Sequence, residues 1–206
     1  ASQYLTEGTV KKSLELLGTD YIDLMFIHQP AGDFMAGYRK LEKAYKEGKI
    51  KAIGISNFQG EKLKKLLEEC EIKPHVIQME AHPYYRDEET ISALAPCGCR
   101  VMAWYPLGHG DHALLEEPIV KELAEKYEKS TAQVILRWHT QVGNIVIPGS
   151  TNPEHIKANL DIFGFELTDE EMKKMEGLNK NVRYYYPDEE KLAAYVNMKI
   201  DLDSQK

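Results

Sequence analysis

Short apolar runs alternate with amphipathic segments of helical spacing along most of the chain, and this alternation limits the possible folds more than any other feature. The runs are YIDLMFI (21–27), IKAIGIS (50–56), HVIQME (75–80), RVMAWY (100–105) and NIVIP (144–148). Each run has the length and the β-branched content of a buried strand. Strand–helix alternation predicts right-handed βαβ units on a parallel sheet, so we expect an α/β fold with five parallel strands.

The expected helices follow these strands. They occupy residues 34–48, 59–70, 87–98, 116–130, 131–143 and 153–160. A further helix is expected over 167–178, because Thr168 stands three residues before Glu171 in a capping-box arrangement. Beyond residue 178 the alternation stops, and three tyrosines stand next to a proline. We therefore expect one domain over residues 1–178 and an irregular C-terminal extension over 179–206.

Charge and hydropathy exclude several classes of partner. Lys and Arg number 26 against 33 Asp and Glu, which gives a formal net charge of −7 and argues against a basic surface for nucleic acid. No apolar run reaches the roughly 20 residues of a membrane-spanning helix. The first residues also lack the apolar core of a secretory signal. These features favour a cytoplasmic protein with neither nucleic acid nor membrane as a partner.

The cysteines and the histidine-rich loop give little support for a disulfide framework or a metal site. Cys70, Cys97 and Cys99 are an odd number, and the CGC spacing differs from that of zinc ribbons and redox motifs. His109 and Asp111, with His112, lie in a glycine-broken segment without a fourth ligand at helical spacing. We expect no metal site.

Polar, aromatic or turn-forming residues follow every predicted strand. They are HQP (28–30), SNF (56–58), QMEAHPY (78–84), AWYPLG (103–108) and IPGST (147–151). The C-terminal ends of parallel strands are where α/β proteins bind ligands, so these segments are candidates for a shared pocket. Ordinary loops leading into helices are polar as well, and the pattern alone leaves both interpretations open.

The same segments resemble the aldo-keto reductase family. The blocks LGTDYIDLMFIHQP, GKIKAIGISNF, QMEAHPY, WYPLG and VIPGSTNPEHIKANLDIFGFELTDEEM match that family in order, over roughly residues 10–175. The resemblance implies a (β/α)8 TIM barrel that binds NADP(H) and reduces aldehydes or ketones to alcohols. Residues 1–178 would then form part of such a barrel, beginning at the helix before its fourth strand.

His28 matches the family's active-site histidine, which orients and polarises the carbonyl of the substrate. A hydrogen-bond donor fixed at a strand end can stabilise the negative charge that develops on that oxygen during hydride transfer. A histidine bonded to a backbone carbonyl is the alternative interpretation. The resemblance also implies contacts to the cofactor. These are Ser56, Asn57 and Gln78 to the carboxamide, Trp104 stacked on the nicotinamide ring, Leu107 and Ser150 near the pyrophosphate and ribose, and Asn159 near the adenine.

Two departures from the family pattern bear on activity. Gly149 and His155 replace the lysine and arginine that commonly bind the 2′-phosphate, so NADH is an alternative to NADPH. No segment matches the family's catalytic aspartate, tyrosine and lysine, so His28 alone represents the tetrad. We therefore expect a truncated form, an incomplete barrel whose open sheet edges allow self-association. A non-catalytic nucleotide-binding or scaffold protein is the competing hypothesis, and an unrelated sugar-phosphate enzyme is a weaker one.

The sequence does not identify the carbonyl substrate. Gln29, the GHGDH loop (108–112) and Tyr184–Tyr186 are candidates for the wall of a substrate pocket. The three tyrosines are equally compatible with a plug that packs against the barrel.

Overall fold

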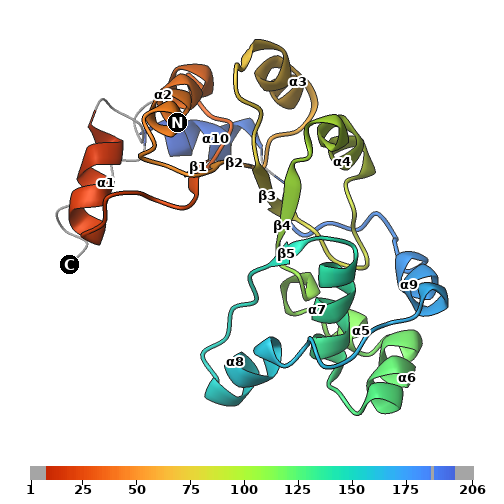
Figure 1. Ribbon diagram of the computed structural model, residues 1–206. Helices are drawn as coiled ribbons and strands as arrows, with labels where there is room; N and C mark the ends of the chain where they lie inside the picture. The colour runs from red at the N-terminus through yellow and green to blue at the C-terminus, as the bar shows by residue number, and fades with distance from the viewer. Residues whose placement is uncertain (1–7, 187, 198–206) are drawn as a thin grey trace. The chain divides into compact units, whose positions relative to one another are not determined.

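The computed structural model describes residues 8–186 and 188–197 (Figure 1). Its strands are β1 (Met25–Ile27), β2 (Ile53–Ser56), β3 (Val76–Glu80), β4 (Arg100–Trp104) and β5 (Ile145–Val146). The helices before β4 are α1 (Thr9–Leu17), α2 (Phe34–Lys46), α3 (Gly60–Glu69), α4 (Glu88–Leu94) and the 3-10 turn η1 (Ala95–Cys97). Those after β4 are η2 (Gly108–Gly110), α5 (His112–Leu115), α6 (Pro118–Tyr127), α7 (Thr131–Gln141), α8 (Pro153–Leu160), α9 (Asp169–Glu176) and α10 (Glu189–Asn197).

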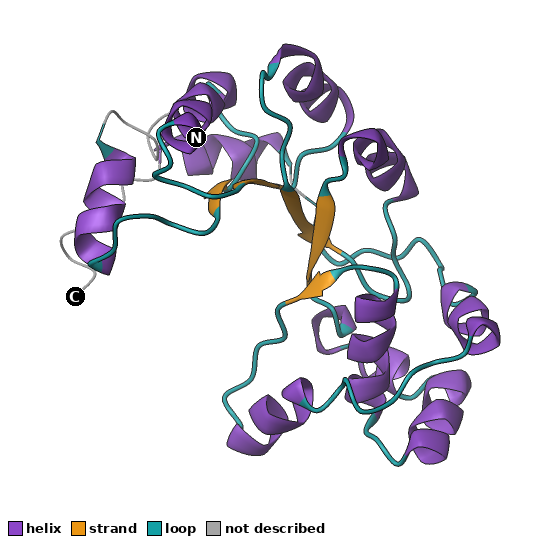
Figure 2. Cartoon of the chain, viewed as in Figure 1, coloured by secondary structure: helices purple, strands orange, loops and turns teal. Residues whose placement is uncertain are grey.

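The five strands form one sheet in the order β1-β2-β3-β4-β5, and Figure 2 shows strands and helices alternating along the chain. Pairing is parallel between β1 and β2, where Phe26 lies opposite Gly54. It is parallel again between β4 and β5, where Ala103 lies opposite Val146. The predicted α/β class and all five predicted strands are confirmed.

The chain divides into two compact units, each with its own core. Of the described residues, the first comprises 8–77, 92–99 and 188–197, and the second comprises 78–91 and 100–186. Among the described residues, no helix is long and apolar enough to cross a lipid bilayer.

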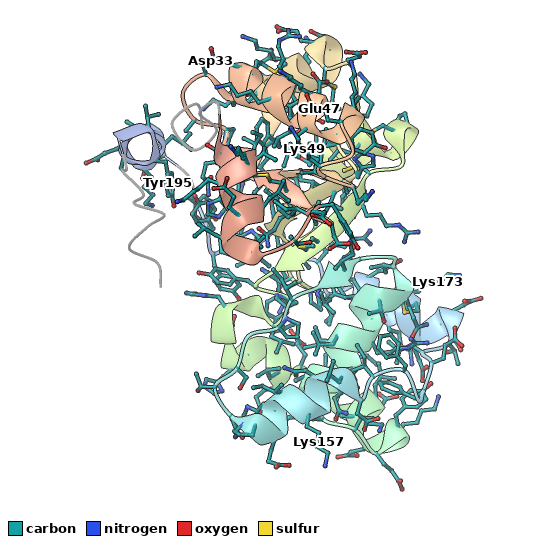
Figure 3. The ribbon with its side chains drawn as sticks, turned by 60° about the vertical axis from the view of Figure 1, so that its left-hand side comes forward. Asp33, Glu47, Lys49, Lys157, Lys173 and Tyr195 are labelled. Carbon is teal, nitrogen blue, oxygen red and sulfur yellow. The ribbon has the colours of Figure 1, made fainter. Side chains whose placement is uncertain are left out.

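In the first unit, α2 packs against β1 and β2. The helix buries Tyr38 and Leu41 completely, and Ile53 of β2 is equally inaccessible. Gly54 is required at its position, because a Cβ there would lie 2.4 Å from the ring of Phe26 on β1. Asp33, labelled in Figure 3, begins α2 by accepting a hydrogen bond from the amide of Ala36 at 2.9 Å.

The core of the second unit lies between α6, α7 and the segments that pack on them. Trp138 on α7 is fully buried with Leu114 of α5 and Val120 of α6. Two capping boxes set the starts of its helices: Ser130 with Gln133 begins α7, and Thr168 with Glu171 begins α9. The box predicted at Thr168 is therefore confirmed.

In the described part of the segment predicted to be irregular, residues Glu189–Asn197 form helix α10. Asp188 begins it by accepting a hydrogen bond from the amide of Lys191 at 2.7 Å, and the apolar Leu192 is 93% buried, with a relative exposure of 7%. The run EEKLAAYVN consists mostly of good helix formers, a signal that was available in the sequence. Asn181 and its neighbours, before the helix, have no regular structure.

Candidate functional site

In the first unit, three of the predicted site residues lie at the C-terminal ends of neighbouring strands. His28 follows β1, Ser56 is the last residue of β2, and Asn57 comes directly after it. The His28 side chain is exposed and has no hydrogen bond to any described residue. Its ring nitrogens are therefore available to a ligand, which is what the predicted polarising role needs.

Asn57 adopts a left-handed backbone conformation, with φ of 58°, which asparagine tolerates better than most residues. Its Nδ2 lies 3.4 Å from Oε1 of Gln29, which is a long hydrogen bond. Gln29 is only 6% exposed. The predicted wall residue Gln29 thus turns inward and helps to place Asn57.

In the second unit, Gln78 lies in the middle of β3 and Trp104 ends β4. Nε2 of Gln78 approaches Sδ of Met102 at 3.7 Å, a weak contact because a thioether is a poor acceptor. Trp104 contacts the rings of Tyr105 and Tyr185, with centroids 4.1 and 5.1 Å away. Its indole Nε1 is buried and has no partner among the described residues.

The loop after β4 is held in a strained shape. Tyr105 has φ of 54°, an uncommon value for a bulky residue that is maintained only by the surrounding packing. The carbonyl of Pro106 accepts a hydrogen bond from Nε2 of the buried His139 at 3.1 Å. Leu107 packs against the core of the unit. The loop that follows Trp104 and contains Leu107 is therefore held in place by His139 of α7.

The remaining predicted contacts lie around α8. Oγ of Ser150 accepts from the amide of Asn152 at 3.1 Å, and Oδ1 of Asn152 accepts from the amide of Glu154 at 2.9 Å. Asn159 is half-buried near the end of the helix. Within the described chain, no hydrogen bond joins Ser150 or Asn159 to Gln78 or Trp104, so their proposed roles stay predictions.

Two residues with evident roles were not singled out from the sequence: Glu80 and His82. Glu80 is 2% exposed and accepts hydrogen bonds from the amides of Tyr184 and Tyr185 at 2.5 and 2.9 Å. Nε2 of His82 lies 3.1 Å from the same carboxylate. A glutamate at the end of a strand with buried neighbours was the available signal, because a buried carboxylate needs partners.

The predicted C-terminal tyrosines fall into two classes. Tyr184 and Tyr185 are half-buried, whereas Tyr186 is 62% exposed. The Tyr184 hydroxyl donates to Oδ2 of Asp111, and Oδ1 of Asp111 accepts a hydrogen bond from the amide of Ala113 at the start of α5. These bonds lower the pKa of Asp111, the one from Tyr184 most strongly.

Metal and disulfide chemistry find no support in residues 8–186 and 188–197. No group of three His, Cys, Asp or Glu residues among them is arranged to hold a metal ion. Cys70, Cys97 and Cys99 form no disulfide within the described part of the chain. Burial raises the pKa of Cys99 to about 12, so this thiol is a poor nucleophile at neutral pH.

Two of the predicted cofactor contacts keep an unpaired side-chain oxygen among the described residues. In the first unit the carbonyl oxygen of Asn57, and in the second that of Gln78, has no hydrogen bond to a described residue. Each side chain can therefore still bind a carboxamide group of a ligand.

Comparison with known proteins places these residues in a family. A model of the Aldo/keto reductase family matches residues 5–180. The chain belongs to the aldo/keto reductase family. Its fold is accordingly that of the (β/α)8 barrel proteins, of which the five parallel strands and their helices are a part.

Characterised relatives include reductases from distant organisms. The chain is 46% identical over 179 residues to a glyoxal reductase of Bacillus subtilis, a match that covers 86% of this chain and 64% of the relative. It is 40% identical over 180 residues to a 9,11-endoperoxide prostaglandin H2 reductase of Trypanosoma cruzi, again with 86% and 64% covered. The chain thus spans less than two thirds of the length of these relatives.

Solved structures agree with this assignment. An aldo-keto reductase from a Medee basin deep-sea metagenome library superimposes with a TM-score of 0.81 at 34% identity, covering 86% of this chain and 66% of the other. The aldo-keto reductase of Bombyx mori, solved in complex with NADP, gives a TM-score of 0.76 at 33% identity, with 85% and 63% covered. Sequence and structure together thus support the assignment of the chain to a family of barrel-type oxidoreductases.

Proposed function

We propose that this polypeptide binds NADP(H) and takes part in the reduction of aldehydes or ketones to alcohols. The observation that carries the proposal is the position of His28, Ser56, Asn57 and Trp104, each at the C-terminal end of a parallel strand or directly after it. Ligands of α/β barrels bind at those ends. Membership of the family and the NADP complex of the Bombyx mori relative support the choice of cofactor.

Each residue has a stated part in this proposal. When bound, the reduced nicotinamide supplies the hydride that the carbonyl carbon receives. Trp104 offers a flat apolar face to the ring, and the amides of Asn57 and Gln78 orient its carboxamide. His28 donates a hydrogen bond to the carbonyl oxygen as negative charge develops there. No residue of this sequence matches the proton-donating tyrosine of the family, so complete turnover requires a proton donor from outside the matched segments.

The test is a titration of the polypeptide with NADPH, followed by an assay with small aldehydes that measures the absorbance of the reduced nicotinamide. Binding that is weakened about fivefold by Trp104→Ala supports the stacking role, because an aromatic contact contributes about 1 kcal/mol beyond its buried area. Unchanged affinity in this variant would contradict the assignment of Trp104. No binding by the wild-type chain would contradict the proposed function.

A non-catalytic nucleotide-binding protein is the second candidate, favoured by the lack of residues that match the catalytic aspartate, tyrosine and lysine. The two candidates differ when a polypeptide that carries the first three βα units of a relative is added. Restored aldehyde reduction that is lost in His28→Gln supports the enzyme. Tight NADPH binding that never leads to turnover supports the binding protein.

We further propose that the chain self-associates through the free edges of its sheet. β1 and β5 are the outermost strands, and each is paired on one side only among the described residues. In the second unit, Ile145 on β5 and Ile147 beyond it are 38% and 43% exposed. An unpaired edge beside exposed apolar side chains favours pairing with another chain.

A further inference from the structure

Glu80 is a buried carboxylate with three hydrogen-bond partners. Oε1 accepts from the Tyr184 amide and lies 3.1 Å from Nε2 of His82, while Oε2 accepts from the Tyr185 amide. Burial alone raises the pKa of Glu80, but the bond from His82 and those from the two amides outweigh it, so the pKa lies below its ordinary value. Glu80 is therefore a charged acceptor that holds two consecutive backbone amides.

The two tyrosines whose amides Glu80 accepts contact other side chains of the second unit. The Tyr185 ring meets the Trp104 indole edge-on, with centroids 5.1 Å apart and an interplanar angle of 72°. The Tyr184 ring lies 5.1 Å from the ring of His82, and its hydroxyl donates to Asp111. Glu80 thus fixes the backbone of Tyr184 and Tyr185, and the Tyr185 ring contacts Trp104, the last residue of β4.

We propose that Glu80 is a positioning residue that holds Tyr185 against Trp104 and so sets the orientation of the indole face that meets the nicotinamide ring. The reference to nicotinamide rests on the proposed function. Glu80 acts through Tyr185 and touches neither cofactor nor substrate. Without the carboxylate, the two amides lose their acceptor, and the Tyr185 ring is no longer held at a fixed angle to Trp104.

The first unit offers a matched control of the same chemistry. Glu42 is 5% exposed and accepts hydrogen bonds from the consecutive amides of Glu71 and Ile72 at 2.7 and 2.8 Å. Glu42→Ala therefore removes a buried carboxylate from two backbone amides, as Glu80→Ala does. Both of the amides that Glu42 accepts belong to the first unit, whereas Trp104 belongs to the second.

The experiment compares Glu80→Ala, Glu80→Gln and Glu42→Ala in the chain as it is. Amide hydrogen exchange is followed in the peptide that contains Tyr184 and Tyr185, and acrylamide quenching reports Trp104, since the only other tryptophan, Trp138, is fully buried. NADPH affinity is the third readout. Glu80→Gln keeps the volume of the side chain but turns an N–H toward at least one donor. It therefore tests the positioning role of Glu80 even if Glu80→Ala fails to fold.

We expect both Glu80 variants to speed exchange at Tyr184 and Tyr185 by about tenfold or more, because charge-assisted bonds to these amides are lost. Quenching of Trp104 should rise, and the Kd for NADPH should increase about fivefold, the size expected for one lost aromatic contact. Glu42→Ala should lower the stability while leaving all three readouts at their wild-type values.

Equal exchange at Tyr184 and Tyr185 in Glu80→Gln and wild type would overturn the proposal. An unchanged NADPH affinity in Glu80→Gln, with a wild-type chain that binds, would overturn it as well. A wild-type chain that binds no nucleotide contradicts the proposed function alone. The exchange and quenching results would then support or overturn the positioning role by themselves.

Discussion

His139 is a buried histidine whose two ring nitrogens both have partners. Nε2 donates to the carbonyl of Pro106 at 3.1 Å, and Nδ1 lies 3.1 Å from Nδ2 of Asn144, which donates to it. Burial lowers the pKa of His139 to about 3, so the ring is neutral at physiological pH. The neutral tautomer with a proton on Nε2 is the form that fixes the loop after β4.

The sign of the pH dependence follows from that pKa. The unfolded chain binds a proton on His139 below its ordinary pKa of 6.5, whereas the folded chain does so only near 3. The stabilisation is thus complete above about pH 6.5 and is lost as the pH falls toward 3. The difference in unfolding free energy between wild type and His139→Gln should shrink by about 1.4 kcal/mol per pH unit across this window.

Urea unfolding of both proteins over that pH range measures this difference. His155→Gln is the control, because His155 is exposed and has no partner among the described residues. It should follow the wild type at every pH. If the difference in unfolding free energy between wild type and His139→Gln does not change with pH, the pKa of His139 is not lowered in the folded chain.

Gly149 and His155 allow a direct test of cofactor preference. Gly149 has open space around the position of a Cβ and no positive φ, so the fold accepts Gly149→Lys. Gly149→Lys with His155→Arg should favour NADPH over NADH by about tenfold or more for each cation, because each adds a charge-assisted bond to the 2′-phosphate. Competition titrations with both nucleotides measure the ratio.

Gly164→Lys is the matched control for this change. Gly164 is also exposed and unhindered, so the substitution adds the same charge to the same unit at another place. A similar gain in Gly164→Lys would mean that general electrostatics, rather than a phosphate site beside α8, sets the preference. Lys157, which Figure 3 labels on α8, is unchanged in all these variants.

At the scale of single elements, helix starts depend on a few side-chain oxygens. In α9, Oγ1 of Thr168 accepts from the amide of Glu171 at 3.3 Å, and the Glu171 carboxylate accepts from the amide of Thr168 at 2.8 Å. Glu171 also binds Lys126 and Tyr127 of α6. Burial opposes its ionisation, but these bonds lower the pKa of Glu171 to about 2. The cap thus joins α9 to α6.

Thr168→Ala should lower the free energy of unfolding by about 1 kcal/mol, the usual cost of losing an N-cap hydroxyl. Thr151→Ala is the control, because Thr151 is exposed and has no hydrogen bond within the described chain. Denaturant unfolding of both variants measures the effect. Equal stabilities would show that water replaces the Thr168 hydroxyl without cost.

At the scale of the whole molecule, the proposed pairing of free sheet edges can be tested by the association of copies of the chain. Ile145→Lys places a charge on the β5 edge and should shift the chain toward the monomer, since edge lysines block strand pairing. Leu160→Lys is the control: Leu160 is 74% exposed but lies on α8, away from any strand edge. Sedimentation velocity over a range of concentrations measures the result. A wild-type chain that stays monomeric throughout contradicts the proposed pairing.

The sequence by itself determined the five strands, the helices that follow them and their order. Alternating apolar runs and amphipathic segments predicted five parallel strands, because the period of the side chains reflects which face of each element is buried. The Thr168 capping box was predicted for a similar reason, since its partners are three residues apart. Helix α10 was missed although its signal was equally local.

Only the tertiary structure decided the roles of Glu80 and His139. Glu80 and the Tyr184 amide that it accepts are 104 residues apart along the chain, and His139 lies 33 residues from Pro106. No local pattern specifies such partners, because a buried polar group is stabilised by whichever distant groups the fold brings to it. For the same reason the sequence left open whether the C-terminal tyrosines line a pocket or pack, and the structure shows Tyr185 packed on Trp104.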